Sequence, residues 1–121
     1  MSIQKSLSLN EKVSESTRIL AKFPDKIPVI IETEDEDIKK NLRKNKFLVP
    51  YDVSASYLLV VVRRQIKISS STALFMFCNN LLLTSNEMMG KVYEDYKIKN
   101  NIGVNSDKFL YIKLSKENTF G

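Results

Sequence analysis

Residues 46–67, KFLVPYDVSASYLLVVVRRQIK, contain a short apolar run, a turn and a longer apolar segment. The first run, KFLVP, has the length and the aromatic and β-branched composition of a strand. It ends on Pro50, which cannot donate a hydrogen bond to a neighbouring strand. We therefore expect residues 46–50 to form a strand at the edge of a sheet.

The longer segment, residues 54–67, is compatible with either a strand or a helix. Its valines favour a strand. Its apolar side chains also recur at helical spacing: Leu58, Val61, Val62 and Ile66. Ser54 is a suitable N-cap, and Arg63 and Lys67 suit the negative C-terminal end of a helix dipole. These signals at both ends predict a helix that follows the edge strand.

Two elements are predicted on the N-terminal side of this stretch. Ser8 and Glu11 have the spacing of a capping box, which indicates a helix that starts directly after Ser8 and ends before Pro24. Residues 26–33, KIPVIIET, are a β-branched run of strand length. Because Pro28 cannot donate to a ladder, we expect the strand to face an edge or a bulge at that point.

Three further elements are predicted on the C-terminal side: a strand over residues 73–78 (ALFMFC), a helix with an apolar stripe over 89–96, and a strand with alternating apolar residues over 108–114 (KFLYIKL). Asn79 and Asn80 predict a turn, because asparagine tolerates positive φ. Thr84 and Glu87 have the spacing of a capping box for the helix.

Charge is unevenly distributed in the first half of the chain. Residues 32–37 are mostly acidic and residues 39–46 (KKNLRKNK) are mostly basic. We interpret them as one solvated loop whose two halves partly neutralise each other. The net charge of +5 permits anionic partners. No aromatic residue lies within the basic run to stack on bases, however, so no nucleic-acid partner is expected.

The composition argues against an enzyme. The 121 residues include no histidine, which removes Ser-His and Cys-His catalysis and the commonest zinc ligand. The three glycines are isolated, so no phosphate-cradling loop is expected. We therefore expect no catalytic residue, no cofactor and no metal. The single cysteine, Cys78, lies in an apolar run, which predicts a buried structural thiol and a reducing compartment.

The length and the order of the elements indicate the fold class. A chain of 121 residues is expected to be one domain. No apolar window approaches the roughly 18 residues of a transmembrane helix, and the N-terminus has no secretory apolar region. The predicted order is helix, strand, strand, helix, strand, short helix, strand. This order favours an α+β fold in which a helix lies across a sheet.

Five blocks of sequence resemble a known family: KFPDKIPVIIE (22–32), KNKFLVPYDVSASYLLVVVRRQI (44–66), ALFMFCNNLLL (73–83), MGKVYEDY (89–96) and FLYIKLSKENTFG (109–121). In order and spacing they resemble the ubiquitin-like autophagy modifiers of the GABARAP and microtubule-associated protein light-chain family. The resemblance implies a ubiquitin-like β-grasp fold with additional N-terminal helices. It divides the chain into an N-terminal helical subdomain (1–22), a β-grasp core (23–115) and a flexible conjugation tail (116–121). The loop between Lys97 and Phe109 is several residues longer than is usual in the family.

The resemblance also implies a chemical role for the last residue, Gly121. In that family an activating enzyme adenylates the carboxylate of the terminal glycine. The acyl group then passes as a thioester to a conjugating enzyme, and it is finally joined to the amino group of phosphatidylethanolamine. Glycine suits this chemistry because a residue without a Cβ can lie in a narrow channel. The chain is expected to be the mature form or to need no processing.

The implied partners are the activating and conjugating enzymes, a deconjugating cysteine protease, motif-bearing cargo receptors and adaptors and, after lipidation, phosphatidylethanolamine membranes. The resemblance implies a cytoplasmic protein when free, and one bound to autophagosomal or related membranes when lipidated. Two alternatives stay open. The chain could be a ubiquitin-like modifier of proteins, or an interaction module that is never conjugated.

The family binds short peptides of the pattern aromatic-x-x-aliphatic, usually with acidic neighbours, which implies a groove along the strand at residues 46–50. The implied aromatic pocket consists of Glu15, Ile19, Pro28, Ile30, Lys46, Leu48 and Phe109. The implied aliphatic pocket consists of Phe47, Val49, Pro50, Val53, Leu58 and Val61. Lys44 and Arg63 are candidates for contacts with the acidic neighbours of the motif.

An ordinary structural explanation competes with this assignment. Ile30, Val61 and Phe109 would be apolar in the core of any such domain. Strand alternation also groups Pro50 with Lys46 and Leu48, although the family's second pocket includes that proline.

Overall fold

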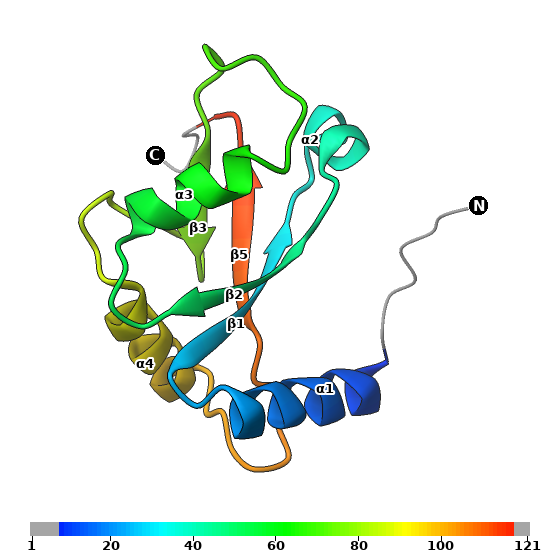
Figure 1. Ribbon diagram of the computed structural model, residues 1–121, viewed down its shortest axis with the longest axis vertical. Helices are drawn as coiled ribbons and strands as arrows, with labels where there is room; N and C mark the ends of the chain where they lie inside the picture. The colour runs from blue at the N-terminus through cyan, green and yellow to red at the C-terminus, as the bar shows by residue number, and fades with distance from the viewer. Residues whose placement is uncertain (1–7, 118–121) are drawn as a thin grey trace.

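The computed structural model describes residues 8–117, which begin with helix α1 (Leu9–Lys22) (Figure 1). The predicted capping box is confirmed: the Glu11 N–H donates to Ser8 Oγ at 3.2 Å, and the Ser8 N–H donates to Glu11 Oε1 at 2.9 Å. The resemblance implied several helices before the first strand. Over the described residues, α1 alone precedes it.

Five strands form one mixed sheet in the order β2-β1-β5-β3-β4. The strands are β1 (Lys26–Glu32), β2 (Lys46–Pro50), β3 (Phe75–Cys78), β4 (Leu81–Leu82) and β5 (Leu110–Ser115). The central pair, β1 and β5, is parallel, and the other pairs are antiparallel. β2 therefore lies at one edge of the sheet, as predicted, and β4 lies at the other.

Pro28 lies in an interior strand, at the point where pairing is incomplete. β1 has neighbours on both sides, so it is not an edge strand as a whole. Its pairing with β5 begins only at Val29, however. The Ile31 N–H donates towards the β2 side, to the Asn45 carbonyl at 2.8 Å, so by alternation the nitrogen of Pro28 faces the β5 side. The nitrogen of Pro28, which carries no N–H, therefore lies just outside the β1–β5 ladder. The prediction that the strand faces an edge at Pro28 is confirmed for this position.

Most of the ambiguous segment is a helix, as predicted: α3 (Ala55–Arg63), which ends before the predicted positions Ile66 and Lys67. The Tyr57 N–H donates to the N-cap oxygen, Ser54 Oγ, at 3.3 Å. Leu58 and Val62 are fully buried against the sheet. The valines fit because helical spacing places the core-facing side chains on one side, so tertiary burial outweighs their preference for strands.

The last helix, α4 (Met89–Lys99), exists as predicted, but the predicted capping box is wrong. Thr84 and Glu87 do contact each other, with the Thr84 N–H 2.6 Å from Glu87 Oε2, but they form a turn before the helix. The free N–H groups at the start of α4 find other partners: those of Met89 and Gly90 donate to the carbonyls that follow β2, at 2.8 and 3.0 Å.

A short helix, α2 (Glu36–Asn41), replaces the predicted solvated loop. The Asp35 carboxylate caps it by accepting from the Ile38 N–H at 3.0 Å. Burial of Ile38 explains why this segment is a helix and not a loop, because its fully buried side chain anchors the segment to the core. The prediction of a loop was therefore wrong for residues 36–41, whereas the charged residues Glu36, Asp37, Lys39 and Lys40 are exposed, as predicted.

The β3–β4 turn is confirmed, since Asn79 and Asn80 adopt φ of 51° and 65°. Strand β4 itself was not predicted. The alternation predicted for the last strand is also confirmed, with Leu110, Ile112 and Leu114 buried.

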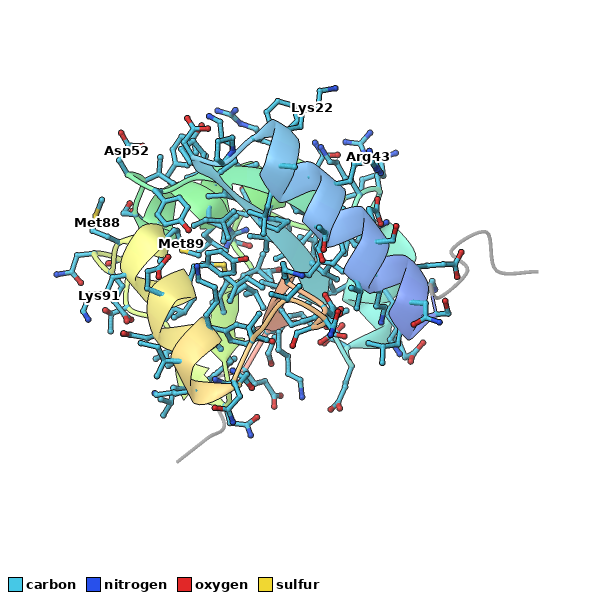
Figure 2. All side chains as sticks on the ribbon, turned by 90° about the horizontal axis from the view of Figure 1, so that it is seen from below. Lys22, Arg43, Asp52, Met88, Met89 and Lys91 are labelled. Atoms are coloured by element: carbon cyan, nitrogen blue, oxygen red, sulfur yellow. The ribbon has the colours of Figure 1, made fainter. Side chains whose placement is uncertain are left out.

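The helices divide between two ends of the molecule. α1 and α4 lie at the end that faces the viewer in Figure 2, whereas α2 and α3 lie at the other end, to which the C-terminal end of β5 also points (Figure 1). α1 packs against β1. The boundaries proposed after residues 22 and 115 stay predictions.

The thiol of Cys78 is buried in the core cluster, as predicted. Burial raises the pKa of this thiol to about 11, because the thiolate would lose its hydration. At pH 8 the folded protein should therefore react with a thiol reagent at least about tenfold more slowly than the urea-unfolded chain. Stopped-flow or spectrophotometric labelling of both forms measures the ratio, and equal rates would contradict the buried assignment.

Candidate peptide-binding site

A cavity of about 230 Å³ opens between α1 and the edge strand β2. It is lined by Glu15, Ile19, Phe23, Pro28, Lys44, Lys46, Phe47, Leu48 and Phe109. Most of this lining is apolar, and the charged groups are a carboxylate and two ammonium groups. Such a site can take an apolar side chain from a partner and can orient charged groups beside it.

Side chains from one side of α1 and from the outward-facing positions of β2 line much of this cavity. Glu15, Ile19 and Phe23 follow each other at intervals of four residues, so they lie on one side of α1 and at its C-terminal end. From β2, Lys46 and Leu48 point away from the core, while their neighbours point into it. Pro28 pairs with Leu48 across the β1–β2 ladder.

Phe109 forms part of the wall and is only 1% exposed. The Lys46 ammonium lies 5.9 Å from the centre of the Phe109 ring and 2.8 Å from Glu15 Oε1. The side chains of Lys46 and Glu15 are 41% and 26% exposed, so the pair is reachable from solvent. An ion pair of that kind contributes roughly 1 kcal/mol or less, so a ligand carboxylate can compete for the lysine.

The wall formed by α1 is held in place by the end of the long loop. Ser16, fully buried, accepts a hydrogen bond from the Lys108 N–H at 3.0 Å and donates to the Val13 carbonyl at 3.2 Å. The Lys108 ammonium donates to Thr17 Oγ1 at 2.9 Å. Lys108 directly precedes Phe109, so one segment both holds α1 and supplies the cavity wall.

The structure brings together most of the predicted aromatic-pocket residues. The exception is Ile30, which is buried and does not line the cavity. Lys44 and Phe47 line it as well, although they were assigned to other parts of the groove, and Lys44 lies 5.2 Å from the centre of the Phe47 ring. Phe23 was missed, although its spacing of four residues from Ile19 was a usable signal.

The residues of the predicted aliphatic pocket lie mainly in the core. Phe47, Val49 and Leu58 are buried in the core cluster, and Val53 and Val61 are partly buried against it. Pro50 is half-buried on the same side of β2 as Leu48, as alternation predicted. Arg63 donates to the Thr72 carbonyl at 2.5 Å, so the loop after α3 already engages it. Gly121 lies outside the described residues.

Among the residues that the structure describes, no strand pairs with the outer side of β2. Within residues 8–117, β2 pairs only with β1, which leaves the backbone groups on its other side without a strand partner. Leu48, at the middle of this strand, is 42% exposed. An extended peptide could therefore pair with β2 while one of its side chains enters the cavity. Among the described residues, no cluster of three or more side chains that could hold a metal ion accompanies the cavity.

Comparison with known proteins identifies the family and the fold. The family model described as "Autophagy protein Atg8 ubiquitin like" matches residues 11–121. "Autophagy-related protein 8e" of Arabidopsis thaliana is 41% identical over 111 residues, which cover 92% of this chain and 85% of that protein. "Autophagy-related protein 8" of Schizosaccharomyces pombe is 39% identical over 114 residues, which cover 94% of this chain and 88% of that protein.

Solved structures show the same fold. The crystal structure of Trypanosoma brucei ATG8 matches with a TM-score of 0.77 and 31% identity, covering 100% of this chain and 98% of that one. Plasmodium falciparum Atg8, solved in complex with a Plasmodium falciparum Atg3 peptide, matches with a TM-score of 0.72 and 26% identity, covering 97% of each chain. The α+β fold described above is thus the ubiquitin-like β-grasp. The chain belongs to the Atg8 family of ubiquitin-like autophagy proteins.

Proposed function

We propose that this protein is an autophagy modifier that is conjugated to phosphatidylethanolamine and that recruits partners carrying aromatic-x-x-aliphatic motifs. The observation that carries the docking part is the apolar cavity beside the free edge of β2, with Lys44 and Lys46 among its lining residues. An apolar hole next to unpaired backbone groups and cations matches an extended, acidic peptide with a bulky apolar anchor.

Binding would involve two changes: the peptide pairs with β2, and an acidic residue of the peptide replaces Glu15 as the partner of Lys46. The peptide backbone adds a strand to β2, and its aromatic side chain enters the cavity against Phe109. An acidic neighbour of the motif displaces Glu15 from Lys46, which lies 2.8 Å from that carboxylate in the free protein. The aliphatic side chain, three residues further on, falls near the half-buried Pro50, Val53 and Val61.

Conjugation would use the carboxylate of Gly121. The carboxylate attacks the α-phosphorus of ATP on the activating enzyme and releases pyrophosphate, and a cysteine thiolate then displaces AMP. After transfer to the conjugating enzyme, the lipid amine displaces the thiolate and loses a proton, which leaves an amide. The protein is thus the group that is transferred rather than the catalyst of the transfer.

The lipid would supply the membrane anchor. None of the helices in the described part of the chain is long and apolar enough to cross a bilayer. Burial of an acyl chain contributes about 0.8 kcal/mol per CH₂, and one chain of myristoyl length anchors only marginally. The two chains of phosphatidylethanolamine would therefore hold the protein on autophagosomal or related membranes.

The proposed partners follow from this chemistry. They are the activating and conjugating enzymes, a deconjugating cysteine protease, and cargo receptors or adaptors that carry the motif. The Plasmodium falciparum Atg8 was solved with an Atg3 peptide. The corresponding peptide from the host organism of this chain is therefore the first ligand to test.

Intact-mass analysis of the protein recovered from membranes tests the proposal directly. We expect the mass of the chain increased by one phosphatidylethanolamine, with the adduct on Gly121. A branched peptide with Phe120-Gly121 on a lysine would instead identify a modifier of proteins. A bare chain under starvation and feeding alike would identify an unconjugated module.

Replacing Leu48 by alanine should weaken peptide binding without unfolding the domain. Leu48 borders the cavity and is 42% exposed, so its loss removes apolar contact mainly from the bound state. We expect an affinity about five- to thirtyfold lower for an acidic aromatic-x-x-aliphatic peptide, measured by calorimetry. Leu81→Ala is the matched control, because Leu81 is 59% exposed at the opposite edge of the sheet. Equal affinities for the two variants would remove the groove from the proposal.

A further inference from the structure

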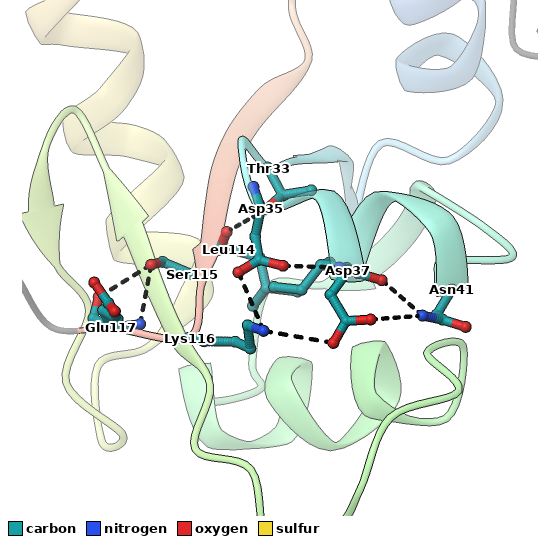
Figure 3. A network of polar contacts seen from close by, with 9 residues as sticks. Thr33, Asp35, Asp37, Asn41, Leu114, Ser115, Lys116 and Glu117 are labelled. Carbon is teal, nitrogen blue, oxygen red and sulfur yellow. Dashed lines mark hydrogen bonds and ion pairs between the residues drawn. The ribbon is translucent and has the colours of Figure 1, made fainter.

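The point where the C-terminal tail leaves the sheet is tied to the start of α2 by a polar network (Figure 3). Thr33 Oγ1 donates to the Leu114 carbonyl at 2.7 Å and accepts from the Asp35 N–H at 3.0 Å. Leu114 is the second-last residue of β5. One threonine therefore fixes both the end of the last strand and the turn that leads into α2.

Lys116 adds a second connection one residue beyond β5. Its ammonium lies 3.5 Å from Asp35 Oδ2 and 3.4 Å from Asp37 Oδ2, so two carboxylates of the α2 segment share one cation (Figure 3). The side chains of Lys116 and Asp35 are both less than one-third exposed, whereas that of Asp37 is about half exposed. Thr33, Asp35, Asp37 and Lys116 are called the root clamp below.

Both carboxylates of the root clamp are held in place by contacts other than Lys116. Asp35 caps α2 through the Ile38 N–H, and this hydrogen bond is the largest cause of the lowered pKa of Asp35. The Asn41 side chain donates to the carbonyl and to Oδ1 of Asp37, at 2.7 and 3.2 Å. Lys116 therefore meets charged groups whose positions are already fixed, which lowers the entropy cost of the ion pairs.

We infer that the root clamp is a positioning device for the conjugation of Gly121, with Lys116 as its positioning residue. The inference rests on the proposed function. Five peptide units separate Lys116 from Gly121, and an extended chain spans at most about 3.6 Å per residue. Gly121 therefore has to lie within about 18 Å of a fixed point beside α2. Without the ion pairs of Lys116, the chain could turn from Ser115 at the end of β5, one residue earlier than Lys116.

The position of the clamp determines which kinetic constant it affects. An enzyme that receives the tail has to order it, and the clamp orders Lys116 and the start of the tail before the encounter. In this proposal Lys116 acts through the path of the chain, with four residues between it and Gly121, and not on the reacting carboxylate itself. Its loss should therefore raise KM for the protein and leave kcat unchanged.

The closing experiment measures thioester formation on the activating enzyme with the full chain and ATP. Lys116→Glu should raise KM about two- to fivefold, the range expected for a partly exposed ion pair, at constant kcat. Lys116→Arg should behave like the wild type. The charge swap Lys116→Asp with Asp37→Lys should recover at least half of the loss. Lys91→Glu is the matched control, because Lys91 pairs with Asp95 at 3.3 Å on α4.

Amide hydrogen exchange gives a readout that does not depend on the enzymes. The amides of residues 115–117 should exchange faster in Lys116→Glu and return towards the wild-type rate in the charge swap. If the wild type forms the thioester and the Lys116→Glu variant has the same KM, only the positioning role is overturned. A wild type that forms no thioester at Gly121 would overturn the proposed function as well, and unchanged exchange rates would show that no clamp forms.

Discussion

Deleting Gly121 is expected to abolish the lipidated form and membrane pelleting, and replacing it by alanine is expected to slow conjugation about a hundredfold. Deletion moves the terminal carboxylate onto Phe120, whose side chain crowds the carbonyl that each thiolate has to attack. In alanine the added methyl displaces the backbone in a channel built around glycine, and a displacement of about 1 Å can cost a hundredfold in rate. Gel mobility and intact mass of the product, followed over time, measure both effects.

Gly103→Ala is the matched control for the alanine variant. A Cβ added at Gly103 would meet no heavy atom within 4 Å, and Gly103 has no positive φ. We therefore expect Gly103→Ala to fold and to be conjugated like the wild type. Lipidation that survived deletion of Gly121 would place the acyl donor elsewhere and would leave the proposed conjugation without its reacting group.

The elements that sequence reasoning found have strong local signals. The edge position of β2 followed from Pro50 at its end, and α1 followed from the Ser8–Glu11 capping box. Each signal lies in the element itself: the capping box is a pair of hydrogen bonds between side chains and the backbone within one turn, and Pro50 lacks the N–H that a further strand would need. For the same reason Ser54 correctly separated a helix from a strand in the valine-rich segment.

The elements that were missed or wrongly explained depend on contacts distant in sequence. In α2, six residues long, Ile38 is the one apolar side chain among charged and polar ones, and its burial is decided by the other elements around it. The start of α4 is capped by the carbonyls of Tyr51 and Val53, and no motif near Met89 encodes that contact. Periodicity could place residues on a side of an element, but it could not show which elements meet.

The features of the candidate site also fall into two groups: those that follow from local periodicity and those that depend on how distant elements pack. The outward position of Lys46 and Leu48 follows from strand alternation, and the pairing of Lys46 with Glu15 needs the packing of α1 against the sheet. The resemblance supplied most of the cavity residues, because the family's spacing is kept here. It did not supply the hydrogen bonds from Lys108, at the end of the loop before β5, to α1.

Replacing Phe47 by alanine is expected to destabilise the protein by about 3–5 kcal/mol, a large part of the roughly 5–15 kcal/mol typical of a domain. The ring is 7% exposed, it belongs to the core cluster, and it pairs across the ladder with the fully buried Val29. Its removal costs both the transfer free energy of the ring and the cavity that it leaves. Urea unfolding measures the change. The slope of the free energy of unfolding against urea concentration should stay constant, while the urea concentration at the midpoint falls.

Leu48→Ala is the matched control, because it truncates the next residue of the same strand on the opposite side of the sheet. Since Leu48 is 42% exposed, its loss should change the free energy of unfolding by less than about 1 kcal/mol. The two substitutions thus separate an effect on the free energy of unfolding, expected for Phe47→Ala, from an effect on peptide affinity, expected for Leu48→Ala. A Phe47→Ala variant that kept wild-type stability but lost peptide binding would show that the ring leaves the core readily. Phe47 would then act as the pocket residue that the family resemblance implies, and the buried position described above would be one of two that the strand adopts.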